Sequence, residues 1–163
     1  MPPFFLALIA VFLADVGARD QRLVAVLSAR LGMSGGLLVT AWLASAAMAG
    51  LAAAVGAGIA VLLPPAGKAM FVALALLLAA LELAWPLRRK EPAEPTRSLF
   101  AALLVIASHQ VSDGARFLIV ALAAATGAPA LAGIGGALGG GAALTLGWAL
   151  GADLTSRVPL RAV

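Results

Sequence analysis

Long apolar stretches separated by short polar breaks make up most of this chain of 163 residues. Apolar runs that carry charged residues only near their ends, if at all, occupy positions 36–63, 68–85 and 129–154. The stretches 3–31 and 98–126 are equally apolar at both ends but carry a polar patch near the middle. A helix needs about 20 residues to cross the hydrocarbon of a bilayer. The pattern therefore predicts an all-α, polytopic integral membrane protein with five spans.

Composition supports lipid as the solvent of these helices. Hydrophobic residues make up 63% of the chain, charged residues 11%, and the mean hydropathy is +1.08, whereas about half of a globular chain is apolar. The net charge of +4 comes from basic residues at segment ends, with no basic stripe and interleaved aromatics, so nucleic acid is not an expected partner. The lack of cysteine excludes disulfides and thiolate metal sites. No catalytic arrangement of Ser, His and Asp appears, so we do not expect an enzyme.

The basic residues also predict an orientation. The polar linker 87–97 carries Arg88, Arg89, Lys90 and Arg97, whereas Lys68 stands on the opposite side. Cytoplasmic loops are enriched in Lys and Arg, so the linker should be cytoplasmic and the N-terminus outside. The N-terminus lacks the positive start of a signal peptide, so the first segment should be retained. We expect the protein to lie in a bacterial inner membrane.

An internal repeat emerges when the chain is shifted by 95 residues. The matches at segment ends are Gly32 with Gly127, Gly56 with Gly151, and Pro64 with Pro159. The first unit, 1–86, holds three spans, and an odd number inverts the next unit in the membrane, which is the plan of many secondary transporters. The second unit, 98–163, holds two spans, so the sixth helix of an inverted repeat of three-helix units is missing. It is lost, or the chain is a fragment, or a partner protomer of a homodimer fills the gap.

Two charged patches, 15–22 and 109–116, lie in equivalent places of the two units. Ionisable residues at membrane depth are costly and mark functional sites. Interrupted apolar segments in corresponding positions of two halves point to a transporter's binding site. On continuous helices Asp15 and Arg19 would share one face and neutralise each other. His109, Asp113 and Arg116 would share a face in the same way.

If the two patched spans cross at mid-membrane, their polar groups converge on one site. Carboxylate and amide oxygens suit hard cations, and carboxylates with a histidine also relay protons. The residues to which we assign ion binding are Asp15, Asp20, Gln110, Ser112 and Asp113, with Asp15 and Asp113 as the main metal ligands. The other assignments are His109 as proton relay, Arg19 and Arg116 as countercharges, and Gly17 and Gly114 as hinges.

The segments 15–21 and 110–116 resemble the hallmark of the transmembrane protein 165 family, which reads Glu-x-Gly-Asp-Lys-Thr once in each inverted three-helix unit. The first copy keeps an acid at Asp15, the glycine at Gly17 and a base at Arg19. The second copy keeps Asp113 and has Gln110 in place of the Glu. The Leu/Ala-rich arms 23–32 and 118–127 are also similar. The resemblance implies an antiporter that exchanges Mn²⁺ or Ca²⁺ for protons, with no resident cofactor.

The balance of charges in the two patches leaves functions other than cation exchange open. Three aspartates of the patches face three arginines, which are Arg19, Arg22 and Arg116. A divalent cation near a neutral site loses the Coulomb attraction that would offset its dehydration. The alternatives are a transport-inactive structural or regulatory subunit of the same scaffold, and export of a small anion drawn by the arginines.

Two further features read as structural. Glu82, near the end of the third span, is expected at the membrane surface. The glycine-rich run 133–141 lies within a span and lacks the Gly-Lys-Ser/Thr ending of a phosphate loop. Small residues in such runs permit close helix packing, which we expect here.

Overall fold

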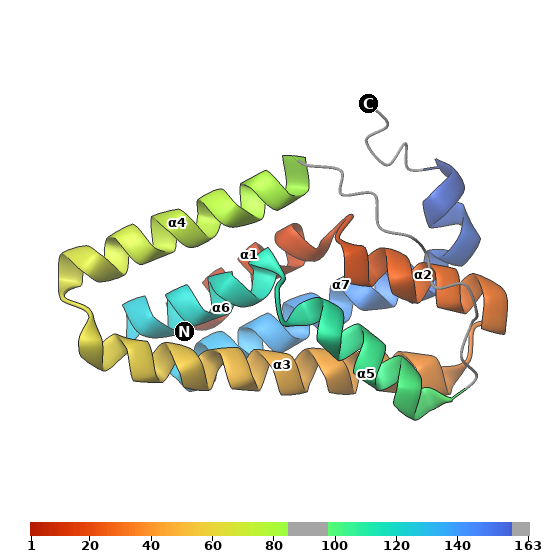
Figure 1. The fold of residues 1–163 in the computed structure, drawn as a ribbon, viewed down its shortest axis with the longest axis horizontal. Coiled ribbons are helices and arrows are strands. Elements are labelled where there is room, and N and C mark those ends of the chain that lie inside the picture. Colours follow the sequence, from red (N-terminus) through yellow and green to blue (C-terminus); the bar gives the residue numbers. More distant parts are fainter. Residues whose placement is uncertain (85–97, 158–163) are drawn as a thin grey trace.

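The computed structural model describes residues 1–84 and 98–157, and all regular structure in these ranges is helical (Figure 1). The linker 87–97 and the segment 158–163, on which the predicted orientation partly depends, lie outside the described residues. The helices are α1 (Pro2–Asp15), α2 (Arg19–Leu31), α3 (Gly35–Leu62), α4 (Pro65–Ala84), α5 (Leu99–Gln110), α6 (Gly114–Thr126) and α7 (Pro129–Arg157). The predicted all-α class is confirmed.

Three of these helices, α3, α4 and the part of α7 over Pro129–Gly151, are long and apolar enough to cross a membrane. The predicted stretches 3–31 and 98–126 are not single helices. Each is a pair of helices, α1 with α2 bent by 62° and α5 with α6 bent by 65°. The described chain therefore has three candidate spans, or five if each bent pair is one broken span.

Local chemistry explains where the helices begin and end. The Ser34 hydroxyl accepts the Leu37 N–H at 3.2 Å and starts α3, and the Ser98 hydroxyl accepts the Ala101 N–H at 3.4 Å and starts α5. Pro65 cannot continue a preceding helix and stands at the start of α4. These signals are short-range, so the sequence already contained them.

The outer surface is apolar. In their most hydropathic stretches, 28% of α3 and 11% of α4 are buried, against 56% of α7. Large apolar side chains such as Leu51, Leu77 and Phe100 are exposed. Water would disfavour so much exposed apolar surface, whereas lipid does not. The helices are those of an integral membrane protein in contact with the bilayer.

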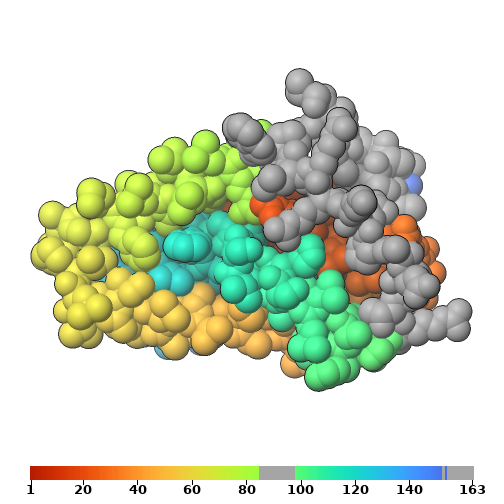
Figure 2. All heavy atoms as spheres, viewed as in Figure 1, coloured from red at the N-terminus to blue at the C-terminus, as the bar shows by residue number. Residues whose placement is uncertain are grey.

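The helices form an elongated bundle around α7, which packs against α1, α2 and α3 (Figure 1). The α1–α2 pair and the α5–α6 pair run in opposite directions along the long axis. Figure 2 shows one face of the bundle, on which α6 lies between α3 and α4. The two breaks therefore come together inside the bundle rather than at its ends.

Glycines let α7 approach the backbones of its neighbours. A Cβ added at Gly135 or Gly139 would collide with the carbonyl oxygen of Phe4 or Leu8 in α1. At Gly147 it would lie 2.6 Å from the Gln21 carbonyl oxygen. The close packing expected for the run 133–141 is confirmed, and it brings α7 directly beneath the α1–α2 break.

Candidate ion-binding site at the two helix breaks

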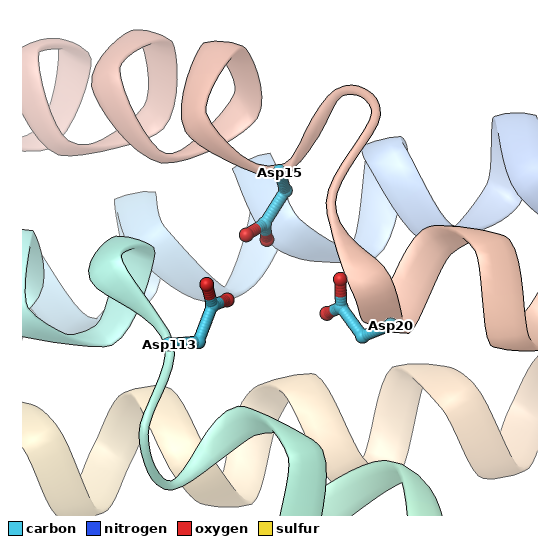
Figure 3. A group of neighbouring side chains, drawn as sticks. All are labelled: Asp15, Asp20 and Asp113. Carbon is cyan, nitrogen blue, oxygen red and sulfur yellow. The ribbon is translucent and has the colours of Figure 1, made fainter. Parts of the chain in front are cut away.

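Three carboxylates meet where the two broken spans cross (Figure 3). Asp15 ends α1, Asp20 lies in the first turn of α2, and Asp113 precedes α6. One oxygen of each carboxylate lies within 4.8 Å of the others, and the side chains point toward one another. The three residues are 0%, 2% and 7% exposed. Of the groups expected to converge, these three aspartates lie together, and we call them the carboxylate triad (Asp15, Asp20, Asp113).

The first break is built around Gly17. This residue has φ of 83°, a conformation that a Cβ disfavours. The Gly17 N–H donates to Gln21 Oε1 at 2.7 Å, and Gln21 Nε2 donates to the Ala143 carbonyl of α7 at 2.8 Å. Gln21 thereby holds the break against the central helix and turns Asp15 and Asp20 to the same side.

The second break lies between Gln110 and Gly114. Gln110 is fully buried, and its Nε2 donates to Asp20 Oδ2 at 3.1 Å, so it belongs to the site as expected. Asp113 is extended, with φ of −90° and ψ of 138°. Gly114 begins α6 and does not have a positive φ. A Cβ there would lie 2.9 Å from Ala79 Cα, so this glycine permits the close approach of α4, and its expected hinge role stays a prediction.

Arg116 supplies the positive charge inside the site. The residue is 3% exposed, its Nη1 lies 3.3 Å from Asp15 Oδ2, and its Nη2 lies 3.8 Å from Asp20 Oδ2. It therefore pairs with acids of the other broken span, and its expected role as the countercharge of an ion site stays a prediction. Counting these four side chains alone, three carboxylates face one guanidinium, an excess of two negative charges when all three acids are ionised.

Arg19 does not pair with Asp15, and that prediction is wrong. Its Nη2 lies 3.0 Å from Glu82 Oε1 of α4. The helix stops at Asp15 and restarts at Arg19, so the face that residues four apart share on a helix does not exist here. With Glu82 included, the count that balanced three aspartates against three arginines becomes four carboxylates against Arg19, Arg22 and Arg116, an excess of one negative charge.

Two other candidates lie outside the triad. Ser112 is exposed, so its hydroxyl is not inside the buried cluster. His109 is half-buried and is not a member of the group of three carboxylates. Because α5 ends at Gln110, His109 does not share a helix face with Asp113. Its role in proton relay stays a prediction.

Glu82 contacts both breaks, which the sequence did not indicate, and its expected place at the membrane surface stays a prediction. Its Oε1 pairs with Arg19, and its Oε2 accepts the Gly114 N–H at 2.7 Å. One carboxylate of α4 therefore contacts both breaks. The signal in the sequence was an acid near the end of the predicted span 68–85, and its spacing indicated no contact with either break.

Ser45 and Gly140 are site residues that no motif marked. A Cβ at Gly140 would lie 2.7 Å from Ser45 Oγ, 2.9 Å from Asp15 Oδ2 and 3.3 Å from Arg116 Nη1. Ser45 is fully buried, and its hydroxyl donates to the Ala137 carbonyl at 3.3 Å. The bare backbone at Gly140 thus forms a wall of the site beside Asp15.

Oxygens without partners collect at this site. Asp15 Oδ1, Asp113 Oδ2 and Gln110 Oε1 are buried and accept no hydrogen bond from the part of the chain that the structure describes. Buried polar atoms usually have a partner. Three such oxygens, from α1, α5 and the start of α6, are free lone pairs of the kind that a bound cation needs.

The fold and the site define an α-helical integral membrane protein with a buried acidic cluster at two helix breaks. Comparison of the chain with protein-family models, curated proteins and solved structures finds no match. The resemblance to the transmembrane protein 165 family therefore rests on the two motifs and stays a prediction.

Proposed function

We propose that the protein is a secondary transporter that exchanges a divalent cation, Mn²⁺ or Ca²⁺, for protons. The carboxylate triad would hold the ion. The observation that carries the proposal is the meeting of three buried carboxylates, from two broken spans, with oxygens within 4.8 Å of one another. Burying several carboxylates together costs free energy because their charges repel and lose hydration, and a bound cation would offset that cost.

The donor set suits such an ion. Ca²⁺ and Mn²⁺ accept carboxylate, amide and carbonyl oxygens. The triad offers carboxylates, and Gln110 adds an amide oxygen with no partner in the described chain. Among the triad and Arg116 alone, the negative charges outnumber the positive one, and this excess would attract a divalent cation. Attraction at this low-dielectric depth would offset the cost of dehydrating the ion.

The dipoles of the helices that end at the two breaks also favour cation binding. The last carbonyls of α1 and α5 carry the negative ends of helix dipoles, and both helices end at the site. The first turns of α2 and α6 present positive ends that stabilise the carboxylates. Broken helices of two inverted units, with half-helix ends at a midplane site, are typical of secondary transporters. The opposite directions of α1–α2 and α5–α6, with bends of 62° and 65°, support an inverted repeat in which each bent pair is one span.

Arg116 would act as a tethered competitor of the ion. It pairs with Asp15 and Asp20 in this structure, where the triad is closed off from solvent. A bound cation would displace the guanidinium from these oxygens, because both seek the same lone pairs. Protons would take the place of the ion on the return step, with His109 as a candidate relay beside the second break.

The test is Mn²⁺ or Ca²⁺ flux into proteoliposomes under a pH gradient. We expect ion uptake driven by the gradient in the wild type and its loss in an Asp15→Asn/Asp113→Asn double variant. Asp153→Asn, at an exposed residue of α7, is the matched control and should transport normally. The proposal fails if wild type and double variant move ions at the same rate.

A transport-inactive structural subunit is the second candidate. It is favoured by the Arg116–Asp15 contact, which joins segments 101 residues apart and so ties the two units together. This alternative predicts no Mn²⁺ or Ca²⁺ binding by calorimetric titration. It also predicts that removing Arg116 destabilises the protein equally with and without added ion.

A further inference from the structure

The carboxylate of Glu82 joins α4 to both helix breaks. Oε1 lies 3.0 Å from Arg19 Nη2 at the start of α2, and Oε2 accepts the Gly114 N–H at 2.7 Å at the start of α6. The rest of the inner face of α4 is apolar, with Ala75 and Ala79 buried against Leu118 and Ala121 of α6. Glu82 is therefore the polar contact in an otherwise apolar α4–α6 interface.

The cap of α6 is unusual. The first amides of a helix have no partner within the helix, and the residue before it commonly accepts one of them. Asp113 occupies that position and is among the best capping residues, yet its side chain makes no such bond. Its carboxylate is turned to Asp15 and Asp20 instead (Figure 3). Glu82, from α4, accepts the first amide of α6, that of Gly114, and places a second negative charge at this helix start. A capping side chain at position 113 would accept the second or third amide instead.

We propose that Glu82 is a positioning residue of the ion site. Its carboxylate occupies the positive end of the α6 dipole, which would otherwise draw the Asp113 carboxylate back, and so leaves Asp113 to complete the triad. This inference rests on the proposed function. Without Glu82, the Asp113 side chain would turn back to cap α6 in the usual way, and the ion would keep two carboxylates instead of three.

Close packing makes the contact geometrically attainable. A Cβ at Gly114 would lie 2.9 Å from Ala79 Cα and 3.0 Å from Glu82 Oε2, so only a glycine at the start of α6 admits α4 to this distance. Two small residues, Gly114 and Ala79, thus allow the Glu82 carboxylate to reach a backbone amide.

The Arg19–Glu82 ion pair should affect the position of Asp113 less than the hydrogen bond to the Gly114 amide does. Its side chains are 28% and 20% exposed, and ion pairs that solvent reaches contribute little. The hydrogen bond to the Gly114 amide, rather than the ion pair, should therefore control where Asp113 points. This difference makes Arg19 a matched control for Glu82.

The first measurement is calorimetric titration of the purified full chain with Mn²⁺. We expect Glu82→Ala to raise the Mn²⁺ Kd by about 10- to 100-fold, the usual effect of losing a group that orients a metal ligand. Glu82→Gln keeps an oxygen acceptor and should have a smaller effect, and Arg19→Gln should bind nearly as the wild type does. Wild-type affinity in Glu82→Ala, or an equal loss in Arg19→Gln, would overturn the proposal.

The second measurement needs no bound ion and so separates this inference from the proposed function. Thermal unfolding is followed in EDTA for Asp113→Ala with Glu82 intact and with Glu82→Ala. With Glu82 present, Asp113→Ala should not lower the Tm, because it removes a buried, repelling charge. In the Glu82→Ala background it should lower the Tm, because it removes the substitute cap. The same shift in both backgrounds refutes the positioning role, whereas failure of the wild type to bind either ion refutes only the proposed function.

Discussion

Replacement of Arg116 by methionine tests whether its charge and that of an ion are interchangeable. The guanidinium is 3% exposed and lies 3.3 Å from Asp15 Oδ2 and 3.8 Å from Asp20 Oδ2. Methionine roughly preserves the volume and apolar stem of the side chain while removing the charge. The variant leaves three buried carboxylates without their described countercharge.

The expected loss is large. Removal of one partner from a buried ion pair typically destabilises a protein by about 3–5 kcal/mol, because the remaining charge stays buried and uncompensated. Exposed pairs such as Arg19–Glu82, with side chains 28% and 20% exposed, contribute about 0–1 kcal/mol. Arg116→Met should therefore be several times more damaging than Arg19→Gln in the ion-free protein.

The assay is the free energy of unfolding in detergent, measured in EDTA and then with Mn²⁺. An ion that binds only the folded state stabilises it by about 2.7 kcal/mol at a concentration of 100 Kd. Because Arg116 no longer competes for the carboxylates, Arg116→Met should bind Mn²⁺ more tightly than the wild type. Added Mn²⁺ should then recover most of the lost stability, with a larger gain than in the wild type.

An Arg116→Met/Asp15→Asn double variant is the control. It removes both members of the shorter of the two Arg116 ion pairs, so it should lose less stability than Arg116→Met alone. A single variant as stable as the wild type would refute the buried-pair reasoning. A large loss that Mn²⁺ does not reverse would instead refute the ion site and favour a structural subunit.

Two glycine predictions test the walls and the break of the site. Gly140→Ala should lower the free energy of unfolding by about 1–3 kcal/mol and weaken Mn²⁺ binding. The reason is that its Cβ would meet Ser45 Oγ at 2.7 Å and Asp15 Oδ2 at 2.9 Å. Gly58→Ala is the control, because the space around the added Cβ is open. Equal unfolding temperatures and affinities for the two variants would contradict this account of the wall. Gly17→Ala should lose about 1–2 kcal/mol of unfolding free energy. Nothing lies within 4 Å of the added Cβ, but the φ of 83° disfavours any residue with a Cβ. An unchanged free energy of unfolding would show that the break does not depend on this backbone conformation.

Much of the fold was predictable because its signals are local. The lengths of the apolar runs identify the helices α3, α4 and α7, since each span needs a set number of apolar residues whatever its neighbours are. Ionisable residues inside apolar stretches are rare enough that Asp15, Asp20 and Asp113 stood out before any coordinates existed. Gly17, which lies within the first patch, also indicated a break there.

The choice of partners was decided only by the tertiary structure. Helical spacing predicted that Asp15 would face Arg19, but the backbone breaks between them, and Asp15 meets Arg116 at a separation of 101 residues. Glu82 meets Gly114 at a separation of 32 residues, and no periodicity links the two. Gly140 borders the site only because α7 packs against α1 beside Asp15. Burial in lipid depends on each segment's own composition, whereas the pairing of buried charges depends on which segments pack together, and this sequence alone does not state that.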